Sequence, residues 1–279
     1  MIADLAVELI HATVQIEQPL GDGTRTVGTG FLINAPTPDG QPRTVLVTAN
    51  HVLQRMPNAQ ARIGFRVGEA DGSWRYTPQK FEIRDADGNP RWTRHPTRDV
   101  AAISITAPEA FAKAAIPTDW LAGEETFSAY SVAAGDEMMA LGFPRGLSAN
   151  PAGFPILRAG RVASFPLAPA AAFPTFLLDF TVFPGNSGGP VFMAEGARRR
   201  PGAPETQEVQ FIAGLLTQQV ELNNERLEIG IVTHARYIRE TLDLLDNPLA
   251  ETTVAAMPGE AAVGGAKAAS ALEAVSEDY

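Results

Sequence analysis

The sequence predicts an all-β protein with two lobes and a single helix at its end. Of its 279 residues, 25 are glycine and 22 are proline, which suits many short strands joined by tight turns. Runs of β-branched and other apolar residues alternate with these turns, as expected for strands. Hydrophobic residues make up 45% of the chain, enough for one large core or two smaller ones.

We expect the first lobe, residues 1–118, to consist of antiparallel strands. Its first strand is predicted from the rough alternation of polar and apolar residues from Leu9 onward. Good helix formers after Pro108 predict a short connector helix at the end of the lobe. The expected strands and hairpins lie at residues 6–17, 28–33, 44–48, 62–95 and 100–105, and the connector lies at 107–115.

The second lobe, residues 119–247, is predicted to hold six strands and the terminal helix. Five residues at helical spacing predict this helix over residues 234–246, with His234 at its start. Residues 248–279 are rich in Ala, Gly and Glu and predict a disordered acidic tail. The strand candidates are 137–141, 156–165, 175–180, 189–193, 209–217 and 227–232, and the helix positions are Tyr237, Ile238, Thr241, Leu242 and Leu245.

Composition excludes several classes of protein. The net charge of −10 repels phosphate backbones, so we expect no nucleic-acid partner. The chain has no cysteine, and neither disulfides nor thiol chemistry can contribute. Residues 1–8 lack the pattern of a signal peptide, and no run approaches 18 apolar residues, which predicts a cytoplasmic protein without a membrane partner.

The segment Pro184-Gly185-Asn186-Ser187-Gly188-Gly189-Pro190 carries the strongest chemical signal. Serine becomes a useful nucleophile when a base removes its proton. The surrounding glycines permit unusual backbone angles and close approach of a substrate. The N–H groups of Gly185 and Ser187 could both point at one oxygen and stabilise its negative charge, as an oxyanion hole does.

The base and its partner are predicted from two further segments. His51 directly follows the apolar segment 44–48, which would hold its imidazole firmly. Asp99 directly precedes the apolar segment 100–105, so we expect it half-buried at the edge of a lobe, where it could orient His51. His95 lies beside Pro96, and we expect it in a surface loop.

These segments resemble the three motifs of trypsin-like serine proteases. Thr48-Ala49-Asn50-His51-Val52 resembles their histidine motif, the segment 98–103 (RDVAAI) their aspartate motif and the segment 185–190 (GNSGGP) their serine motif. The order His, Asp, Ser along the chain also matches. The resemblance implies a catalytic triad of His51, Asp99 and Ser187, with no metal or cofactor.

Three other stretches resemble the HtrA (high-temperature-requirement A) branch of bacterial trypsin-like peptidases: 135–147, 178–184 and 229–232. The resemblance covers about residues 8–246 and implies two antiparallel six-stranded β-barrels of the chymotrypsin type, with the triad between them. We expect no PDZ domain. Asn186 is uncharged and could not pair with a newly cut N-terminus, so activation by N-terminal cleavage is not expected.

The resemblance also bears on specificity. Thr181 lies six residues before Ser187, where specificity for Arg or Lys needs an acid. We expect a pocket that accepts small or medium apolar side chains of a protein or peptide substrate. Its predicted lining is Thr181, Val182, Phe183, Leu215, Leu216 and Thr217.

Two alternatives stay open. The chain could be a latent or degenerate protease-fold module that binds proteins, with a regulatory protein partner that activates it. The motif G-x-S-x-G also occurs in α/β-hydrolases, which need a helix after the serine and an acid before the histidine. Here Gly188, Gly189 and Pro190 start a helix poorly, and no aspartate lies between Ser187 and His234.

Overall fold

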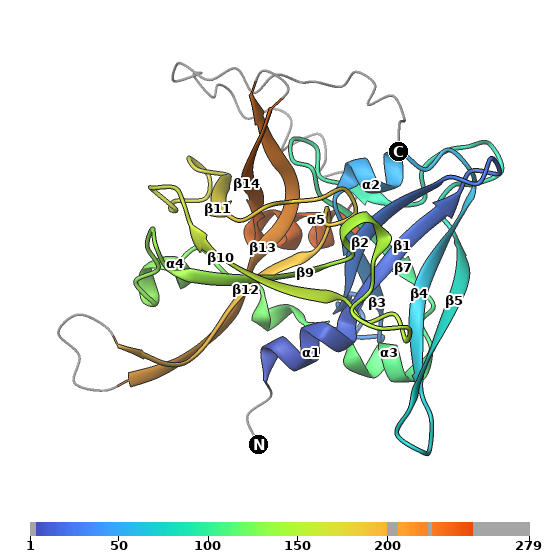
Figure 1. Cartoon of the computed structure of the whole chain (residues 1–279), viewed down its shortest axis with the longest axis horizontal. Helices are drawn as coiled ribbons and strands as arrows, with labels where there is room; N and C mark the ends of the chain where they lie inside the picture. The colour runs from blue at the N-terminus through green and yellow to red at the C-terminus, as the bar shows by residue number, and fades with distance from the viewer. Residues whose placement is uncertain (1–3, 200–205, 223–224, 248–279) are drawn as a thin grey trace.

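The computed structural model describes residues 4–199, 206–222 and 225–247, and its strands form two separate sheets (Figure 1). The first sheet contains β1 (Thr13–Pro19), β2 (Arg25–Asn34), β3 (Thr44–Thr48), β4 (Gln60–Gly68), β5 (Trp74–Glu82), β6 (Thr93–Arg94), β7 (Ala101–Ile105) and β8 (Ile116–Pro117). The second contains β9 (Glu137–Gly142), β10 (Ile156–Val162), β11 (Thr175–Asp179), β12 (Pro190–Arg199), β13 (Thr206–Leu222) and β14 (Glu225–His234). The helices are α1 (Leu5–Ala12), α2 (Asn50–Gln54), α3 (Glu109–Ala114), α4 (Thr126–Ala129) and α5 (Ala235–Asp246), with 3₁₀ turns η1 (Thr118–Trp120) and η2 (Pro144–Gly146).

The C-terminal sheet closes into a six-stranded barrel, which confirms that part of the predicted fold. Its strands follow the order β10-β11-β14-β13-β12-β9, and β9 pairs with β10 to complete the ring. Every pairing is antiparallel. Phe176, Phe192, Leu215 and Val232 come from four of its strands and are fully buried in the core.

The prediction of two six-stranded barrels is confirmed for this sheet only. The N-terminal sheet has eight strands, in the order β5-β4-β1-β2-β3-β7-β6 with β8 beside β2, and within the described residues β5 and β6 do not pair with each other. β5 is largely exposed, and β6 has only two residues. Closure depends on how edge strands meet, which the alternation within each strand does not specify.

The strand predicted at residues 6–17 is wrong in its first half, where the chain forms α1. The carboxylate of Asp4 caps this helix by accepting a hydrogen bond from the N–H of Ala6, at 3.0 Å. Leu5, Leu9 and Ala12 lie on one face of the helix and are fully buried. The strand starts only at Thr13, because the cap and the helical spacing outweigh the weak alternation after Leu9.

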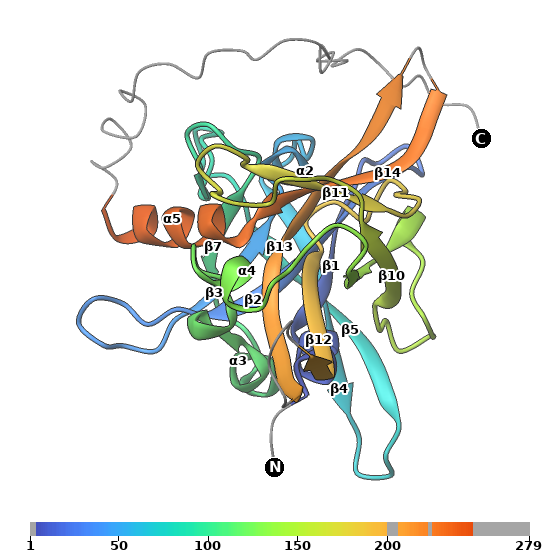
Figure 2. The ribbon, with the colours of Figure 1, turned by 90° about the vertical axis from the view of Figure 1, so that its left-hand side faces the viewer.

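The predicted connector and terminal helices are both present, as α3 and α5. His234 stands at the N-cap of α5. This helix packs on β6 and β7 of the N-terminal sheet and on β13 and β14 of the barrel, so it bridges the two (Figure 2). Tyr237, Ile238 and Leu242 supply its buried face, and Asp246 at its end pairs with Arg43 at 2.7 Å.

A buried arginine ties the start of the chain to the second half of the molecule. Arg66 of β4 is 1% exposed and donates hydrogen bonds to the carbonyl oxygens of Ile10, His11 and Thr13, at 2.8 to 3.2 Å. It also donates to the carbonyl of Gly153 at 3.0 Å. Burial lowers its pKa to about 10. The guanidinium thus replaces the water that four backbone acceptors would otherwise need.

Within the described residues, no helix is long and apolar enough to cross a membrane. The acidic tail predicted at residues 248–279 lies outside them.

Candidate active site

His51 lies in the first turn of α2, immediately after the buried strand β3. β3 pairs with β2 on one side and with β7 on the other. Because α2 begins two residues after this central strand, the start of the helix is held firmly. Gly28 of β2 makes room for this helix, because a Cβ atom there would lie 2.3 Å from Cγ1 of Val52. The sequence therefore places His51 on a rigid support, as predicted.

Asp99 lies just before β7 and contacts His51 twice. Its Oδ2 is 2.6 Å from Nδ1 of His51, and its Oδ1 accepts a hydrogen bond from the backbone N–H of His51 at 2.9 Å. The side chains of His51 and Asp99 are 21% and 24% exposed, so both are half-buried and open on one side. The two contacts fix both the position of the carboxylate and the plane of the imidazole.

The loop that presents Asp99 is shaped by His95. The sequence predicts His95 in a surface loop, and this is wrong because the residue is 4% exposed. Its Nδ1 accepts hydrogen bonds from the backbone N–H groups of Thr97 and Arg98, at 3.2 and 3.1 Å. These bonds hold the two residues that directly precede Asp99.

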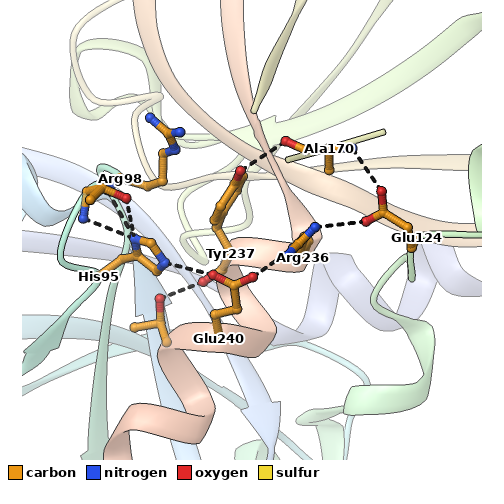
Figure 3. Close-up of polar contacts among 9 residues, drawn as sticks. His95, Arg98, Glu124, Ala170, Arg236, Tyr237 and Glu240 are labelled. Carbon is orange, nitrogen blue, oxygen red and sulfur yellow. Dashed lines mark hydrogen bonds and ion pairs between the residues drawn. The ribbon is translucent and has the colours of Figure 1, made fainter. Parts of the chain in front are cut away.

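A polar network connects this loop to α5 (Figure 3). Nε2 of His95 lies 3.0 Å from Oε2 of Glu240, so His95 donates there while its Nδ1 accepts. The hydrogen bond from His95 holds the pKa of Glu240 below its usual range. Glu240 also binds Arg236 at 2.7 Å, and Arg236 pairs with Glu124 at 3.2 Å. The terminal helix α5 thus holds the loop before Asp99 in place through the contact between Glu240 and His95.

Ser187 lies in a tight turn between two glycines with left-handed backbone angles, Gly185 (φ 94°) and Gly188 (φ 89°). A Cβ atom on Gly188 would lie 2.2 Å from Oγ1 of Thr48 and 3.0 Å from N of Ala49. The serine turn therefore packs against the residues that lead into His51. The hydroxyl of Ser187 donates to the carbonyl of Thr217 at 3.1 Å, and within the described residues no hydrogen bond joins it to His51.

Thr29 of β2 clamps the serine turn to the N-terminal sheet. Its N–H donates to the carbonyl of Ser187 at 2.9 Å. Its hydroxyl donates to the carbonyl of Gly185 at 2.6 Å and accepts from the N–H of Phe143 at 3.1 Å. One threonine thus positions the serine turn and the neighbouring segment after β9, and both contacts of its hydroxyl are buried.

The two predicted oxyanion donors, the N–H groups of Gly185 and Ser187, have no acceptor among the described residues. The N–H groups of Gly185 and Ser187 make no hydrogen bond to any described residue, whereas those of Asn186 and Gly188 bind the carbonyls of Phe183 and Leu216. Free backbone N–H groups on either side of one residue can share a single oxygen.

The predicted pocket residues differ in exposure. Thr181 and Phe183 are half-buried, whereas the other four are at most 3% exposed: Val182, Leu215, Leu216 and Thr217. The guanidinium of Arg158, from β10, lies against this segment and donates to the carbonyl of Thr181. The role of these residues in substrate binding stays a prediction.

Sequence reasoning missed Thr29, His95 and Arg158. Thr29 stands between Gly28 and Gly30, and such glycines in a strand mark a close approach of backbone. Arg158 stands at an inward position of a predicted strand, where an unpaired charge is unusual. Nothing in the sequence around His95 signals its contact with α5.

Together, the closed barrel, the N-terminal sheet, whose strands are antiparallel except for β8 beside β2, and the terminal helix form a mostly β, chymotrypsin-like fold. Among solved structures, the chain resembles the HtrA-type protease AlgW with a tripeptide at 15% identity and a TM-score of 0.52, covering 88% of this chain and 63% of AlgW. AlgW with a decapeptide gives 14% identity and a TM-score of 0.50, covering 88% and 67%. Protease Anisep from Arthrobacter nicotinovorans gives 16% identity and a TM-score of 0.49, covering 85% and 96%.

The AlgW likeness supports the fold, and the chain spans less than two thirds of AlgW in the tripeptide complex. No curated protein matches the sequence. The family model for the trypsin-like peptidase domain matches residues 28–197, a span that contains His51, Asp99 and Ser187. The chain therefore belongs to the trypsin-like peptidase family.

Proposed function

We propose that the chain is a serine endopeptidase that cuts peptide bonds through an acyl-enzyme. Oγ of Ser187 attacks the scissile carbonyl carbon while His51 takes the hydroxyl proton. His51 then gives this proton to the leaving amine as the C–N bond breaks. Water then attacks the ester carbon while His51 takes one of its protons, and His51 gives this proton to Oγ of Ser187 as the ester C–O bond breaks and the acid product leaves.

The double contact between Asp99 and His51 carries this proposal. The carboxylate accepts from Nδ1, so the proton of the neutral imidazole sits on Nδ1 and the lone pair of Nε2 is left for Ser187. When His51 takes up the proton of Ser187, the adjacent carboxylate stabilises the positive charge. The contact with the backbone N–H keeps Asp99 in place through both steps.

The free N–H groups of Gly185 and Ser187 supply the expected oxyanion hole. As the carbonyl carbon becomes tetrahedral, its oxygen gains negative charge, which both donors can stabilise. Each donor of this kind contributes about 10²- to 10³-fold to the rate. Thr29 holds the carbonyls of both residues, so the donors do not have to reorganise during the reaction.

The hydroxyl of Ser187 must change partners before it attacks. In the structure it donates to the carbonyl of Thr217. Attack requires it to leave this acceptor and donate to Nε2 of His51. Catalytic hydrogen bonds in substrate-free sites are often absent or long and form when the substrate binds.

A protein or peptide substrate fits this chemistry. AlgW, whose fold the chain resembles, was solved with a tripeptide and with a decapeptide. Digestion of a denatured proteome extract, with mass spectrometry of the new N-termini, tests the proposal. We expect new termini with the wild type and none with Ser187→Ala. If neither protein produced termini, the result would favour a latent or degenerate module that needs a regulatory partner.

A further inference from the structure

Arg158 lies on the less exposed face of β10. Along β10, Leu157, Ala159 and Arg161 are exposed, whereas Arg158 and its inward neighbours are half-buried. An arginine at such a position needs a partner for its charge, because partial burial removes water from the guanidinium. Burial lowers the pKa of Arg158, although an arginine side chain stays protonated in proteins.

The guanidinium of Arg158 lies on the segment that leads into Ser187. One of its N–H groups donates to the carbonyl of Thr181, six residues before Ser187. Its Cζ atom lies 5.1 Å from the ring centre of Phe180 and 5.6 Å from that of Phe183. Thr181 and Phe183 belong to the predicted lining of the pocket for the substrate residue before the cut. The contacts of Arg158 therefore place a positive charge beside that predicted pocket.

No acidic partner of this charge lies in the described part of the chain. Within the described part of the chain, no carboxylate pairs with Arg158, and its only hydrogen-bond acceptor is a neutral carbonyl. Its Nε and Nη2 atoms have no acceptor there and are not among the buried unsatisfied atoms, so they remain open to solvent. A second guanidinium, that of Arg145, lies 5.6 Å from the ring centre of Phe183 and also lacks a carboxylate partner there.

Two uncompensated cations beside the serine turn are unexpected in a chain of net charge −10. A half-buried guanidinium with free donors binds a carboxylate through charge-assisted hydrogen bonds. A neutral side chain in the same place would leave the cation unpaired, and a cationic one would be repelled.

We propose that Arg158 makes the enzyme selective for peptides with an acidic residue, glutamate or aspartate, directly before the cut. This inference rests on the serine endopeptidase function proposed above. It replaces the small apolar preference that the sequence predicts, because that expectation considered only Thr181–Phe183 and the facing strand. The guanidinium binds the substrate carboxylate through Nε and Nη2 while Nη1 stays on the carbonyl of Thr181.

The test uses three peptides that differ only in the residue before the cut: Glu, Gln or Lys. For the wild type we expect kcat/KM for the Glu peptide to exceed that for the Gln peptide at least tenfold, with the Lys peptide slowest. Arg158→Gln should bring the Glu-to-Gln ratio close to one. Arg158→Glu should invert the order and favour the Lys peptide, which a merely structural role would not produce.

Arg161→Gln is the matched control, because Arg161 lies on the same strand and points outward, with its guanidinium on the carbonyl of Gly135. It should keep the wild-type ratios. Fluorophosphonate labelling of Ser187 in the same samples separates the two proposals. Labelled wild type that prefers neutral peptides, or an Arg158→Gln variant that keeps the Glu preference, would overturn the inference alone. Wild type that is neither labelled nor active would overturn both.

Discussion

Both carboxylate oxygens of Asp99 contact His51: Oδ2 lies 2.6 Å from the imidazole Nδ1, and Oδ1 accepts a hydrogen bond from the backbone N–H of His51 at 2.9 Å. The first contact sets the tautomer of the imidazole, and the second locks the carboxylate to α2. A carboxylate held at both oxygens cannot rotate away from the ring. His51 is therefore oriented before any substrate arrives.

Asp99→Asn should lower kcat by about 10⁴-fold. Asparagine has the same shape, but its NH₂ group can donate to Nδ1 and so favour the tautomer that carries the proton on Nε2. The base would then be blocked although the fold is intact. Steady-state kinetics on a cleavable peptide measures the loss, and a thermal melt checks the fold. Activity within tenfold of the wild type would contradict this role of Asp99.

Thr29→Val should lower kcat by about tenfold to a hundredfold, because a displacement of roughly 1 Å in the serine turn can cost this much. Valine keeps the shape of the side chain and loses the hydroxyl that joins Gly185 to Phe143. Thr29→Ser restores the hydroxyl and should recover most of the rate. The comparison of kcat and KM for both variants decides the point. Equal losses with serine and valine would show that Thr29 contributes packing only.

Arg66→Met should destabilise the protein by about 3 kcal/mol or more, because four backbone carbonyls, two of them in fully buried hydrogen bonds, would lose their donor. Denaturant unfolding at neutral pH measures the change. Arg75→Met on the neighbouring strand β5 is the control, since the side chain of Arg75 is 63% exposed and pairs only with the exposed Glu69 within the described residues. Its effect should stay within about 0.5 kcal/mol. Similar effects of the two substitutions would contradict the role of Arg66 as an internal tie.

Burial lowers the pKa of His234 to about 4, and this makes stability depend on pH. In the unfolded chain a histidine takes up its proton below about pH 6.5. Between these values the unfolded state binds more protons, so stability is full above pH 6.5 and falls as the pH drops towards 4. The loss attributable to His234 is about 3 kcal/mol at pH 4.

Unfolding of the wild type and of His234→Gln at pH 7 and pH 4 tests this assignment. Glutamine does not titrate, so the variant should lose about 3 kcal/mol less stability than the wild type over this range. Parallel losses in the two proteins would mean that another group causes the pH dependence.

The features that are determined by residues close together in the sequence were predictable. The strand before His51, the strand after Asp99 and the glycines around Ser187 are local signals, and each predicts the setting of its own side chain. The helix α5 follows in the same way from the spacing of residues such as Ile238 and Leu242. Only a resemblance to known motifs could place the three segments at one site.

The parts that depend on distant contacts were not predictable. Arg158 meets Thr181 across 23 residues, and Thr29 meets Gly185 across 156. The alternation in a strand shows which side chains point inward, but not which segment they meet there. For the same reason the N-terminal strands were predictable one by one, whereas the order in which they pair was not.

Labelling with a fluorophosphonate probe shows whether Ser187 is an activated nucleophile, because the probe reacts with a serine only when a base has activated it. Wild type, Ser187→Ala and Asp99→Asn should be compared in parallel. We expect rapid labelling of the wild type at Ser187, slow labelling of Asp99→Asn and none of Ser187→Ala. A folded wild type that resists the probe, or labelling that persists in Ser187→Ala, would contradict the proposed role of Ser187.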